Sequence, residues 1–349
     1  MRLGLSLGYQ TALTTPADHL ALAQEADRLG YAVVWAAEAY GSDAPSMLAW
    51  IAGQTQRIDL GAAVMQIPAR SPAMTAMTAA TIDALSGGRF RLGLGVSGPQ
   101  VSEGWHGVRF AHPLARTREY VDIVRLAIAR KPVAYDGEHY TLPLPDGPGK
   151  ALRLGFHPPR AAIPIYLAAI GPRNLELAGE IADGWLAIFF APDMAGDYLR
   201  HIENGRAASA PGRGFDVAPS VPVVLGDDLA ACADAVRPYA ALYVGGMGSR
   251  ESNFYHQLAV RMGYADAAAR VQDLYLDRKL RDAAAAVPQA FIERTSMLGT
   301  KDQITERIRQ YAAAGVGTLS VSPYGGDRES AIATLRQVAE AYAASGVAE

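Results

Sequence analysis

The sequence predicts an α/β protein, a closed (β/α)8 TIM barrel with a helical insertion between strands 7 and 8. A β-like run followed by a helical run recurs about eight times, which is typical of a parallel sheet covered by helices. Residue types that cap helices occur at the ends of the helical runs. The insertion is indicated by helical patterns at about residues 245–295. Eight repeats in this length favour a closed barrel, so we expect one domain over residues 1–349.

The first half of the chain carries clear start and stop signals. We expect strands at residues 3–7, 32–36, 59–65 and 90–94, and helices at 15–29, 45–54, 71–85 and 114–129. Thr15 and Ser71 each precede a proline, which suits an N-cap followed by the first helical position. Gly30 and the pair Gly87-Gly88 follow helical runs and suit left-handed C-caps.

The second half continues the alternation. Strands are expected at residues 163–168, 185–188, 219–225 and 319–321, and the last helix at 328–344. Asp136-Gly137 lies between short β-like runs and predicts a hairpin outside the main sheet. Thr300 with Gln303 forms a capping box for the helix before the last strand.

Composition restricts the class of function. Half of the residues are apolar, which suffices for a large core, and a formal charge of −3 disfavours nucleic acid as a partner. The chain has no apolar run of membrane-spanning length, no signal-peptide pattern and a single cysteine, Cys232. We therefore expect a cytoplasmic protein that acts on a small molecule, with no nucleic acid and no membrane as partner.

The glycine-rich segment after the fourth strand has three interpretations. Gly93, Gly95 and Gly98 match the spacing GxGxxG. A Rossmann site is disfavoured because three βα units precede the motif and the acids about 20 residues later, Glu119 and Asp122, fall within a helix. A tight strand-to-helix turn is the plain alternative. A phosphate cradle at the end of a barrel strand fits the segment best.

A second turn of this kind follows the fifth strand. Gly171-Pro172-Arg173-Asn174 precedes a helix and could form another wall of the same phosphate site. The alternative is an ordinary turn in which Asn174 is the N-cap. The residues alone slightly favour the ordinary turn.

Three residues are candidates for moving a proton. Glu38 and Tyr40 follow the second strand, where a barrel presents functional groups, although Glu38 could equally be a solvated loop acid. His106 lies beyond the glycine-rich segment and could donate a proton near pH 7, or it could be a structural histidine. In the insertion, residues 253–256 (NFYH) could face a substrate or could simply pack. The seven histidines show no metal-ligand spacing, so we expect no metal.

Four segments carry a resemblance to a known family. They are GAAVMQIPARSP at residues 61–72, IDALSGGRFRLGLG at 82–95, VSGPQVSEGWHG at 96–107 and GGMGSRESNFYHQLAVRMGY at 245–264. Across essentially the whole chain the sequence resembles the luciferase-like monooxygenase superfamily. Within it, the chain is similar to the deazaflavin (coenzyme F420)-dependent oxidoreductase branch, which includes methylenetetrahydromethanopterin reductase.

The resemblance implies where the cofactor lies. In this family strand 3 ends in a bulge with a non-prolyl cis peptide behind the deazaflavin ring, and the matching bond is Ala63–Val64. The cofactor-binding positions that the resemblance implies are Gly8, Ala63, Val64, Met65, Gln66, Ser97, Gly98, Pro99, Ile170, Gly171 and Pro172. Among these, Val64 and Met65 would press on one ring face. The phosphate would sit on residues 97–99 and near residues 170–172.

Departures from the family pattern bear on the reaction. Sugar-phosphate and alcohol dehydrogenases of this branch carry an Asp-His pair where Glu38 and Ala39 stand, and the sugar-phosphate enzyme has a catalytic Glu where Pro99 stands. The resemblance then implies hydride transfer from reduced coenzyme F420 to a C=C, C=N or carbonyl group of a small organic substrate. Glu38, Tyr40 and His106 are the candidates for the proton donor.

Two other functions stay open at this point. One is an FMNH₂-dependent two-component monooxygenase on the same barrel. The other is a non-catalytic flavin or deazaflavin binder. By analogy with relatives, a homodimer through the barrel helices is also possible.

Overall fold

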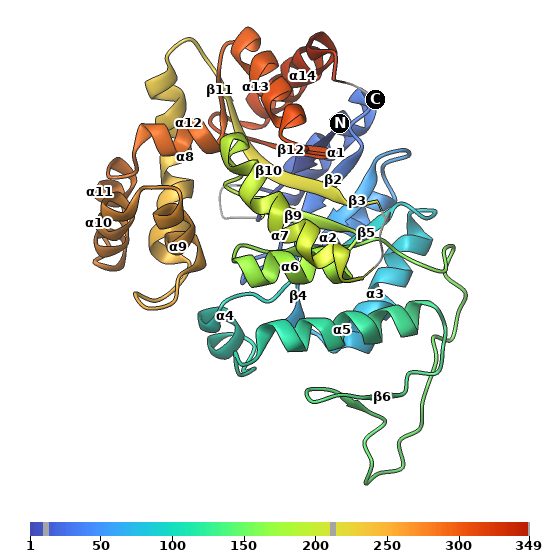
Figure 1. Cartoon of the computed structure of the whole chain (residues 1–349). Coiled ribbons are helices and arrows are strands. Elements are labelled where there is room, and N and C mark those ends of the chain that lie inside the picture. Colours follow the sequence, from blue (N-terminus) through green and yellow to red (C-terminus); the bar gives the residue numbers. More distant parts are fainter. Residues whose placement is uncertain (10–13, 210–213, 348–349) are drawn as a thin grey trace.

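Eight parallel strands close into a ring in the computed structural model, which describes residues 1–9, 14–209 and 214–347 (Figure 1). In order around the ring they are β1 (Arg2–Ser6), β2 (Val33–Ala36), β3 (Asp59–Ala62), β5 (Phe90–Gly95), β8 (Ile165–Ala168), β9 (Gly184–Ile188), β10 (Asp216–Leu225) and β12 (Thr318–Pro323). Leu3 of β1 stands opposite Leu319 of β12, so the last strand returns to the first. The predicted (β/α)8 barrel is confirmed.

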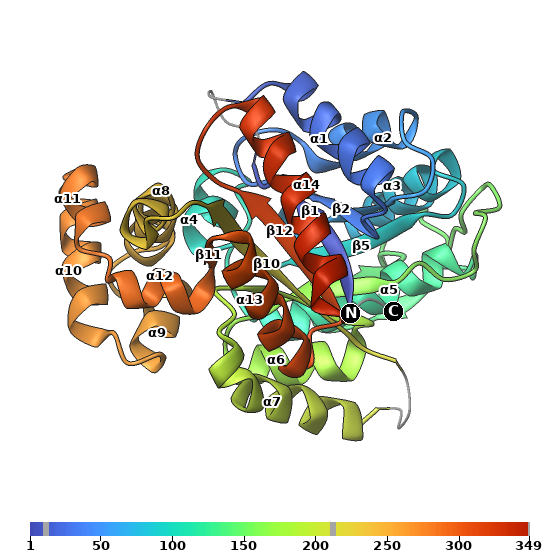
Figure 2. The ribbon, with the colours of Figure 1, turned by 90° about the horizontal axis from the view of Figure 1, so that it is seen from above.

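Helices surround this ring (Figure 2). They are α1 (Pro16–Leu29), α2 (Ala44–Ala52), α3 (Pro72–Leu85), α5 (Pro113–Ile128), α6 (Pro172–Ile181), α7 (Ala195–Ala207), α13 (Lys301–Ala313) and α14 (Arg328–Ser345). The predicted caps of the early helices are confirmed: the side chains of Thr15 and Ser71 accept backbone N–H groups of their first turns, and Gly30 ends α1 with φ 81°. The short helix α4 (Pro99–Gly104) precedes α5.

The third strand differs from the prediction. Residues 59–65 were expected to form one strand, but β3 stops at Ala62 and the short β4 (Met65–Gln66) follows. The bond between Ala63 and Val64 is cis, as the family resemblance implied. A 3₁₀ turn, η1 (Ile67–Ala69), then leads to α3.

The insertion forms a helical layer beside the barrel (Figures 1 and 2). It comprises α8 (Leu229–Ala241), a π-helical turn η3 (Leu242–Gly246), α9 (Phe254–Arg261), α10 (Ala265–Leu276), α11 (Leu280–Ala285) and α12 (Gln289–Thr295). This layer begins at α8, earlier than the pattern at about 245–295 suggested. After it, the strand β11 (Met297–Gly299), which the sequence did not reveal, pairs with the end of β10.

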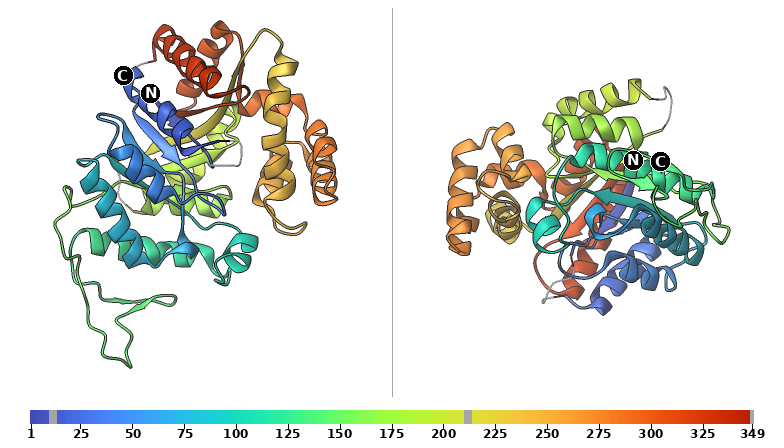
Figure 3. Two further views of the ribbon diagram at one scale, coloured as in Figure 1. Left: turned by 180° about the vertical axis from the view of Figure 1, so that it is seen from behind. Right: turned by 90° about the horizontal axis from the view of Figure 1, so that it is seen from below.

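The remaining elements lie at the periphery. The predicted hairpin is present as β6 (Tyr135–Asp136) and β7 (Thr141–Leu142), and a 3₁₀ turn, η2 (Pro192–Met194), precedes α7. The terminal amine of Met1 donates to the Val347 carbonyl at 3.2 Å, so the two ends meet on the side that faces away from α9–α11 (Figure 3). No helix in the described ranges has the length and apolarity needed to cross a membrane.

Candidate active site at the barrel mouth

A cavity of about 690 Å³ opens at the carboxyl ends of the barrel strands. We call it the mouth cavity. Its lining comes from the ends of β1 and β2, the bulge after β3, the segment after β5, the start of α5, the turn after β8 and the insertion. Functional groups in TIM barrels gather at this end, and a cavity of this volume matches a small-molecule site.

The bulge after β3 forms an apolar wall of the mouth cavity. Val64 lines the cavity, and the strand β5 passes directly behind it. A Cβ at Gly95 would lie 2.6 Å from Val64 Cγ2, and a Cβ at Gly93 would lie 1.9 Å from the Ala62 carbonyl oxygen. Two glycines of the GxGxxG motif are therefore required by the close approach of the bulge to β5, rather than by a phosphate.

Gln66 ties this bulge to the glycine-rich segment. Its side-chain N–H donates to the Ala39 carbonyl at 2.8 Å, and its side-chain oxygen accepts from the Ser97 hydroxyl at 2.8 Å. Ser97 has φ 62°, a left-handed conformation that is uncommon for a serine. The hydrogen bond to Gln66 holds this turn, so that Ser97 and Gly98 line the mouth cavity.

The turn after β8 provides a polar part of the lining. Gly171 is the N-cap of α6 and contributes no side chain, and Pro172 has no N–H. The Asn174 N–H donates to the Gly171 carbonyl at 3.0 Å, so the Arg173 N–H is the first one of the helix without a partner in the described chain. Arg173 also lines the mouth cavity, and its guanidinium has no hydrogen-bond or ion-pair partner within the described residues. Asn174 is not the N-cap, as the ordinary-turn interpretation required; its amide donates to the Ala168 carbonyl at 3.4 Å. A helix start with an adjacent free cation is suited to an anion.

Most of the positions implied for the cofactor come together here. Those that line the mouth cavity are Val64, Gln66, Ser97, Gly98, Ile170, Gly171 and Pro172. Gly8, Ala63, Met65 and Pro99 do not line it. The prediction for the Met65 side chain is corrected: it is fully buried in the core, because neighbouring residues in extended chain point to opposite sides and Val64 takes the side that faces the cavity.

Glu38 lines the mouth cavity but is fully occupied by internal donors. One oxygen accepts from the Gln66 N–H at 3.0 Å and the other from the Ala44 N–H at 3.1 Å. Both oxygens also bind the guanidinium of Arg70. A carboxylate offers about four acceptor positions, and all four are used. Glu38 therefore joins the bulge, α2 and Arg70, and it lacks the free oxygen that the proton-donor prediction required.

The other two predicted proton donors have different positions. Tyr40 lines the rim of the mouth cavity with 62% of its surface exposed, and its hydroxyl has no partner in the described part of the chain. His106 does not line the cavity. Its Nε2 is buried with no hydrogen-bond partner in the described ranges. The structure thus leaves Tyr40 in contact with the cavity and removes His106 from it.

A group of tyrosines that no sequence pattern indicated forms another part of the lining of the mouth cavity. Tyr9, after β1, and Tyr255, in α9, both line it. The hydroxyl of Tyr243 donates to that of Tyr9 at 3.1 Å, and its ring meets that of Tyr255 edge-on at 4.8 Å. Burial raises the pKa of Tyr9, and the pKa values of Tyr243 and Tyr255 are raised by the same cause. These phenols are therefore neutral donors near pH 7.

Residues 253–256 of the insertion were expected to face a substrate, and two of the four line the mouth cavity. Phe254 and Tyr255 line the mouth cavity. Asn253 is buried; it caps α9 and donates to the carbonyls of Tyr243 and Val244 at 3.1 and 3.0 Å. His256 lies outside the lining. Asn253 therefore positions the aromatic pair.

Known proteins are similar to this chain in sequence and in architecture. The family model described as luciferase-like monooxygenase matches residues 1–318. A Mycobacterium tuberculosis protein that carries the name of a coenzyme F420-dependent oxidoreductase is 45% identical over 343 residues, which cover 96% of this chain and 99% of that protein.

Two further comparisons agree with these. The 5,10-methylenetetrahydromethanopterin reductase of Archaeoglobus fulgidus is 30% identical over 315 residues, which cover 88% of this chain and 90% of the relative. The structure of the coenzyme F420-dependent tetrahydromethanopterin reductase from Methanopyrus kandleri superposes with a TM-score of 0.81 at 24% identity, over 96% of this chain and 97% of that chain.

Proposed function

This chain belongs to the luciferase-like monooxygenase family, and on that basis we propose that it is a coenzyme F420-dependent oxidoreductase. The reaction is hydride transfer from the reduced cofactor to a C=C, C=N or carbonyl group of a small organic substrate. The observation that carries the proposal is the mouth cavity, whose lining includes the apolar Val64 and the tyrosines Tyr9 and Tyr255. The names of the F420-dependent relatives support the choice of cofactor.

The residues of the mouth cavity fit a deazaflavin with a phosphate arm. Val64 offers an apolar surface for one face of a flat ring. Ser97 and Gly98 in the segment after β5, and Gly171 with Arg173 in the turn after β8, offer hydrogen-bond donors and a cation for the phosphate. When bound, the reduced cofactor supplies the hydride; the protein orients the acceptor over the ring and excludes water.

The proton comes from Tyr9 in this proposal. Reduction of a carbonyl adds the hydride to carbon and requires a proton on oxygen. Because the Tyr9 oxygen accepts from the Tyr243 hydroxyl at 3.1 Å, the proton of Tyr9 is free to point into the mouth cavity. The same donor stabilises the phenolate that Tyr9 becomes after it gives the proton up. Tyr40, which faces solvent at the rim, returns a proton to the site from water.

A homodimer and a cytoplasmic location are part of the proposal. Large apolar side chains are exposed on neighbouring helices of the barrel: Trp50 on α2, and Met74, Met77 and Leu85 on or beside α3. A patch of this kind suits a contact with a second copy. Light scattering should give twice the chain mass, and Met77→Glu should give the mass of one chain; a wild-type monomer would contradict the dimer. The lone thiol, Cys232, suits a reducing compartment.

Titration of the purified protein with deazaflavin and with FMN tests the cofactor. We expect coenzyme F420 to bind saturably, followed by its fluorescence, and its reduced form to be oxidised by at least one compound of a carbonyl, enone and imine panel. Tight binding of reduced FMN without affinity for deazaflavin would contradict the proposal. Cofactor binding with no turnover on the whole panel would favour a non-catalytic binder.

The alternative is an FMNH₂-dependent monooxygenase, and the description of the matching family favours keeping it. It differs from the proposal in consuming O₂. Oxygen uptake with reduced FMN and a candidate substrate would establish it. No uptake with FMN, together with turnover of reduced deazaflavin under nitrogen, would exclude it.

A further inference from the structure

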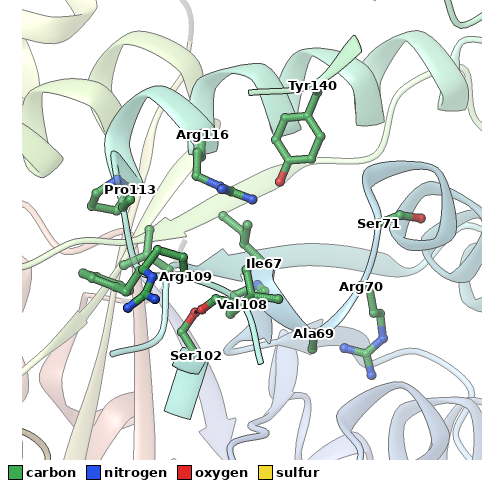
Figure 4. A pocket seen from close by; sticks show the side chains of 14 residues that line it. Ile67, Ala69, Arg70, Ser71, Ser102, Val108, Arg109, Pro113, Arg116 and Tyr140 are labelled. Atoms are coloured by element: carbon green, nitrogen blue, oxygen red, sulfur yellow. Dashed lines mark hydrogen bonds between the residues drawn. The ribbon is translucent and has the colours of Figure 1, made fainter. Parts of the chain in front are cut away.

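A second cavity lies next to the mouth cavity. Its volume is about 290 Å³, and the two cavities share Val96, Phe110 and Pro113 in their linings, so they adjoin at these residues. The second cavity is enclosed by the segment from Ile67 to Ser71, the residues that lead into α5, and the hairpin (Figure 4). We call it the arginine cavity because Arg70, Arg109 and Arg116 line it.

The three arginines differ in their partners. Arg70 is bound by the carboxylates of Glu38 and Asp43, so its charge is balanced. Arg109 is exposed and its guanidinium lies 3.4 Å from both oxygens of Glu103. Arg116 differs from both, because no carboxylate or hydrogen-bond acceptor for its guanidinium occurs among the described residues.

The guanidinium of Arg116 is held in place by an aromatic ring. Its central carbon lies 5.6 Å from the centroid of Tyr140, and Tyr140 packs edge-on against the buried Tyr120 at 6.0 Å. Figure 4 shows Arg116 and Tyr140 on one side of the cavity, with Ala69, Ser102 and Val108 on the other. Stacking on an aromatic face orients a guanidinium but does not neutralise its charge.

We propose that the arginine cavity binds a carboxylate or phosphate group carried on an arm of the molecule that occupies the mouth cavity. The lining includes no acidic side chain, so the half-buried Arg116 has its charge unbalanced until an anion arrives. The apolar residues Ile67, Val96 and Val108 line the same space and suit the carbon atoms of the arm. A guanidinium with a free edge binds carboxylate or phosphate with two parallel hydrogen bonds.

Two sources can supply this anion, and the identity of the source rests on the proposed function. The first is the acidic side arm of coenzyme F420, which ends in glutamate carboxylates beyond its phosphate. The second is a substrate that carries a carboxylate. Both sources present a carboxylate to Arg116, so the binding experiment tests each source with its own pair of ligands.

The experiment compares Arg116→Gln with the wild type. Arg200→Gln is the matched control, because Arg200 lies on the exterior of α7 and pairs only with the exposed Asp197 in the described chain. The first pair of ligands is coenzyme F420 with its glutamates and the form without them, which keeps the phosphate; their dissociation constants are measured by fluorescence. The second pair is levulinate and 2-pentanone, which are titrated into the protein loaded with coenzyme F420.

We expect the wild type to bind the acidic member of one pair at least about tenfold more tightly than its neutral or shortened partner. Arg116→Gln should abolish that preference and leave the affinity for the neutral or shortened ligand unchanged. Arg116→Lys should restore part of the preference. The pair that responds identifies the source. The proposal is overturned if Arg116→Gln changes neither preference more than the control does, with melting temperatures that show all variants folded.

Binding of a free anion tests the arginine cavity independently of the proposed function. If the wild type binds no coenzyme F420, the proposed function fails, and the arginine cavity is then judged with γ-glutamylglutamate alone. A rise in melting temperature with this dipeptide that is lost in Arg116→Gln supports the anion site. A rise of equal size in both proteins, or none in either, contradicts it.

Discussion

The two ends of the barrel use polar residues in different ways. At the amino end of the strands, one oxygen of Asp216 accepts from the hydroxyls of Tyr166 and Thr318 at 2.9 and 2.7 Å. Arg91 pairs there with Asp59 at 2.7 Å. At the carboxyl end, Tyr9, Tyr40 and Arg173 face the mouth cavity. The amino end therefore serves stability, whereas the carboxyl end retains capacity for a ligand.

Glu38 shows that position alone does not decide a residue's role. It lies at the carboxyl end and lines the mouth cavity, yet four internal donors bind it. Tyr9 lies at the same end, and its hydroxyl accepts one hydrogen bond, from Tyr243, and donates none within the described chain. What separates a structural group from a chemical one at this end is the number of hydrogen bonds already made inside the protein.

The largest expected effect on stability is at the amino end. Asp216→Ala should lower the free energy of unfolding by about 3–5 kcal/mol, because it leaves the hydroxyls of Tyr166 and Thr318 without their shared acceptor and removes the ion pairs of Asp216 with Arg91 and Arg2. Urea unfolding measures the loss. Asp197→Ala, on an exposed surface, should change it by less than about 0.5 kcal/mol. A decrease of less than about 1 kcal/mol in the free energy of unfolding for Asp216→Ala would contradict the stabilising role of the amino end.

At the carboxyl end we expect the rate to change rather than stability. Tyr9→Phe should slow the reduction of the best substrate by the reduced cofactor about 100-fold, because it removes the proposed proton donor and keeps the ring. The control is Tyr324→Phe, since Tyr324 packs on Tyr239 but does not line the mouth cavity. Single-turnover kinetics measure both. Equal rates for Tyr9→Phe and the wild type would assign the proton to another donor.

Cofactor affinity should respond to the glycine-rich segment. A Cβ at Gly98 would point into open space, with Gln100 Oε1 as its nearest neighbour at 3.6 Å, so Gly98→Val should fold. Its side chain would occupy the place proposed for the phosphate and weaken coenzyme F420 binding about tenfold. Gly155→Val, in an exposed loop with free space, is the control. Unchanged affinity for Gly98→Val would place the phosphate elsewhere.

The smallest expected effect lies outside both ends, on the barrel helices. The pKa of Glu25 is lowered to about 2, chiefly by its hydrogen bond from Arg28 and also by Arg336. Because the folded pKa is depressed, the stabilisation is present above the ordinary pKa near 4.5 and is lost as the pH falls towards 2. Glu25→Gln should therefore lower the free energy of unfolding by less than about 1 kcal/mol at pH 7, and by a smaller amount as the pH approaches 2. A cost that does not vary with pH would contradict this.

The sequence predicted the features that local chemistry determines. The caps at Thr15, Gly30 and Ser71 follow from residue types within one helical turn, and the alternation of strands and helices predicted the barrel. The helical pattern at about residues 245–295 indicated the insertion, and the family resemblance added the cis bond at Ala63–Val64. Each of these depends on residues that are adjacent in the chain.

Contacts between residues that are far apart in the chain could not be predicted from the sequence. Tyr9 and Tyr243 meet across 234 positions, and Glu38 meets Arg70 across 32, so no local spacing could indicate a free hydroxyl or an occupied carboxylate. The strand β11 is only three residues long, too short for a periodic signal. The break after Ala62 also fixed which of Val64 and Met65 faces the mouth cavity.

A crystal structure of the protein with coenzyme F420 would test the central claim most directly. The account predicts one ring face against Val64, the phosphate between Gly98 and Arg173, and the open face towards Tyr9. A ring bound outside the mouth cavity, or one whose face towards Tyr9 is covered by protein and leaves no room for a substrate, would contradict it.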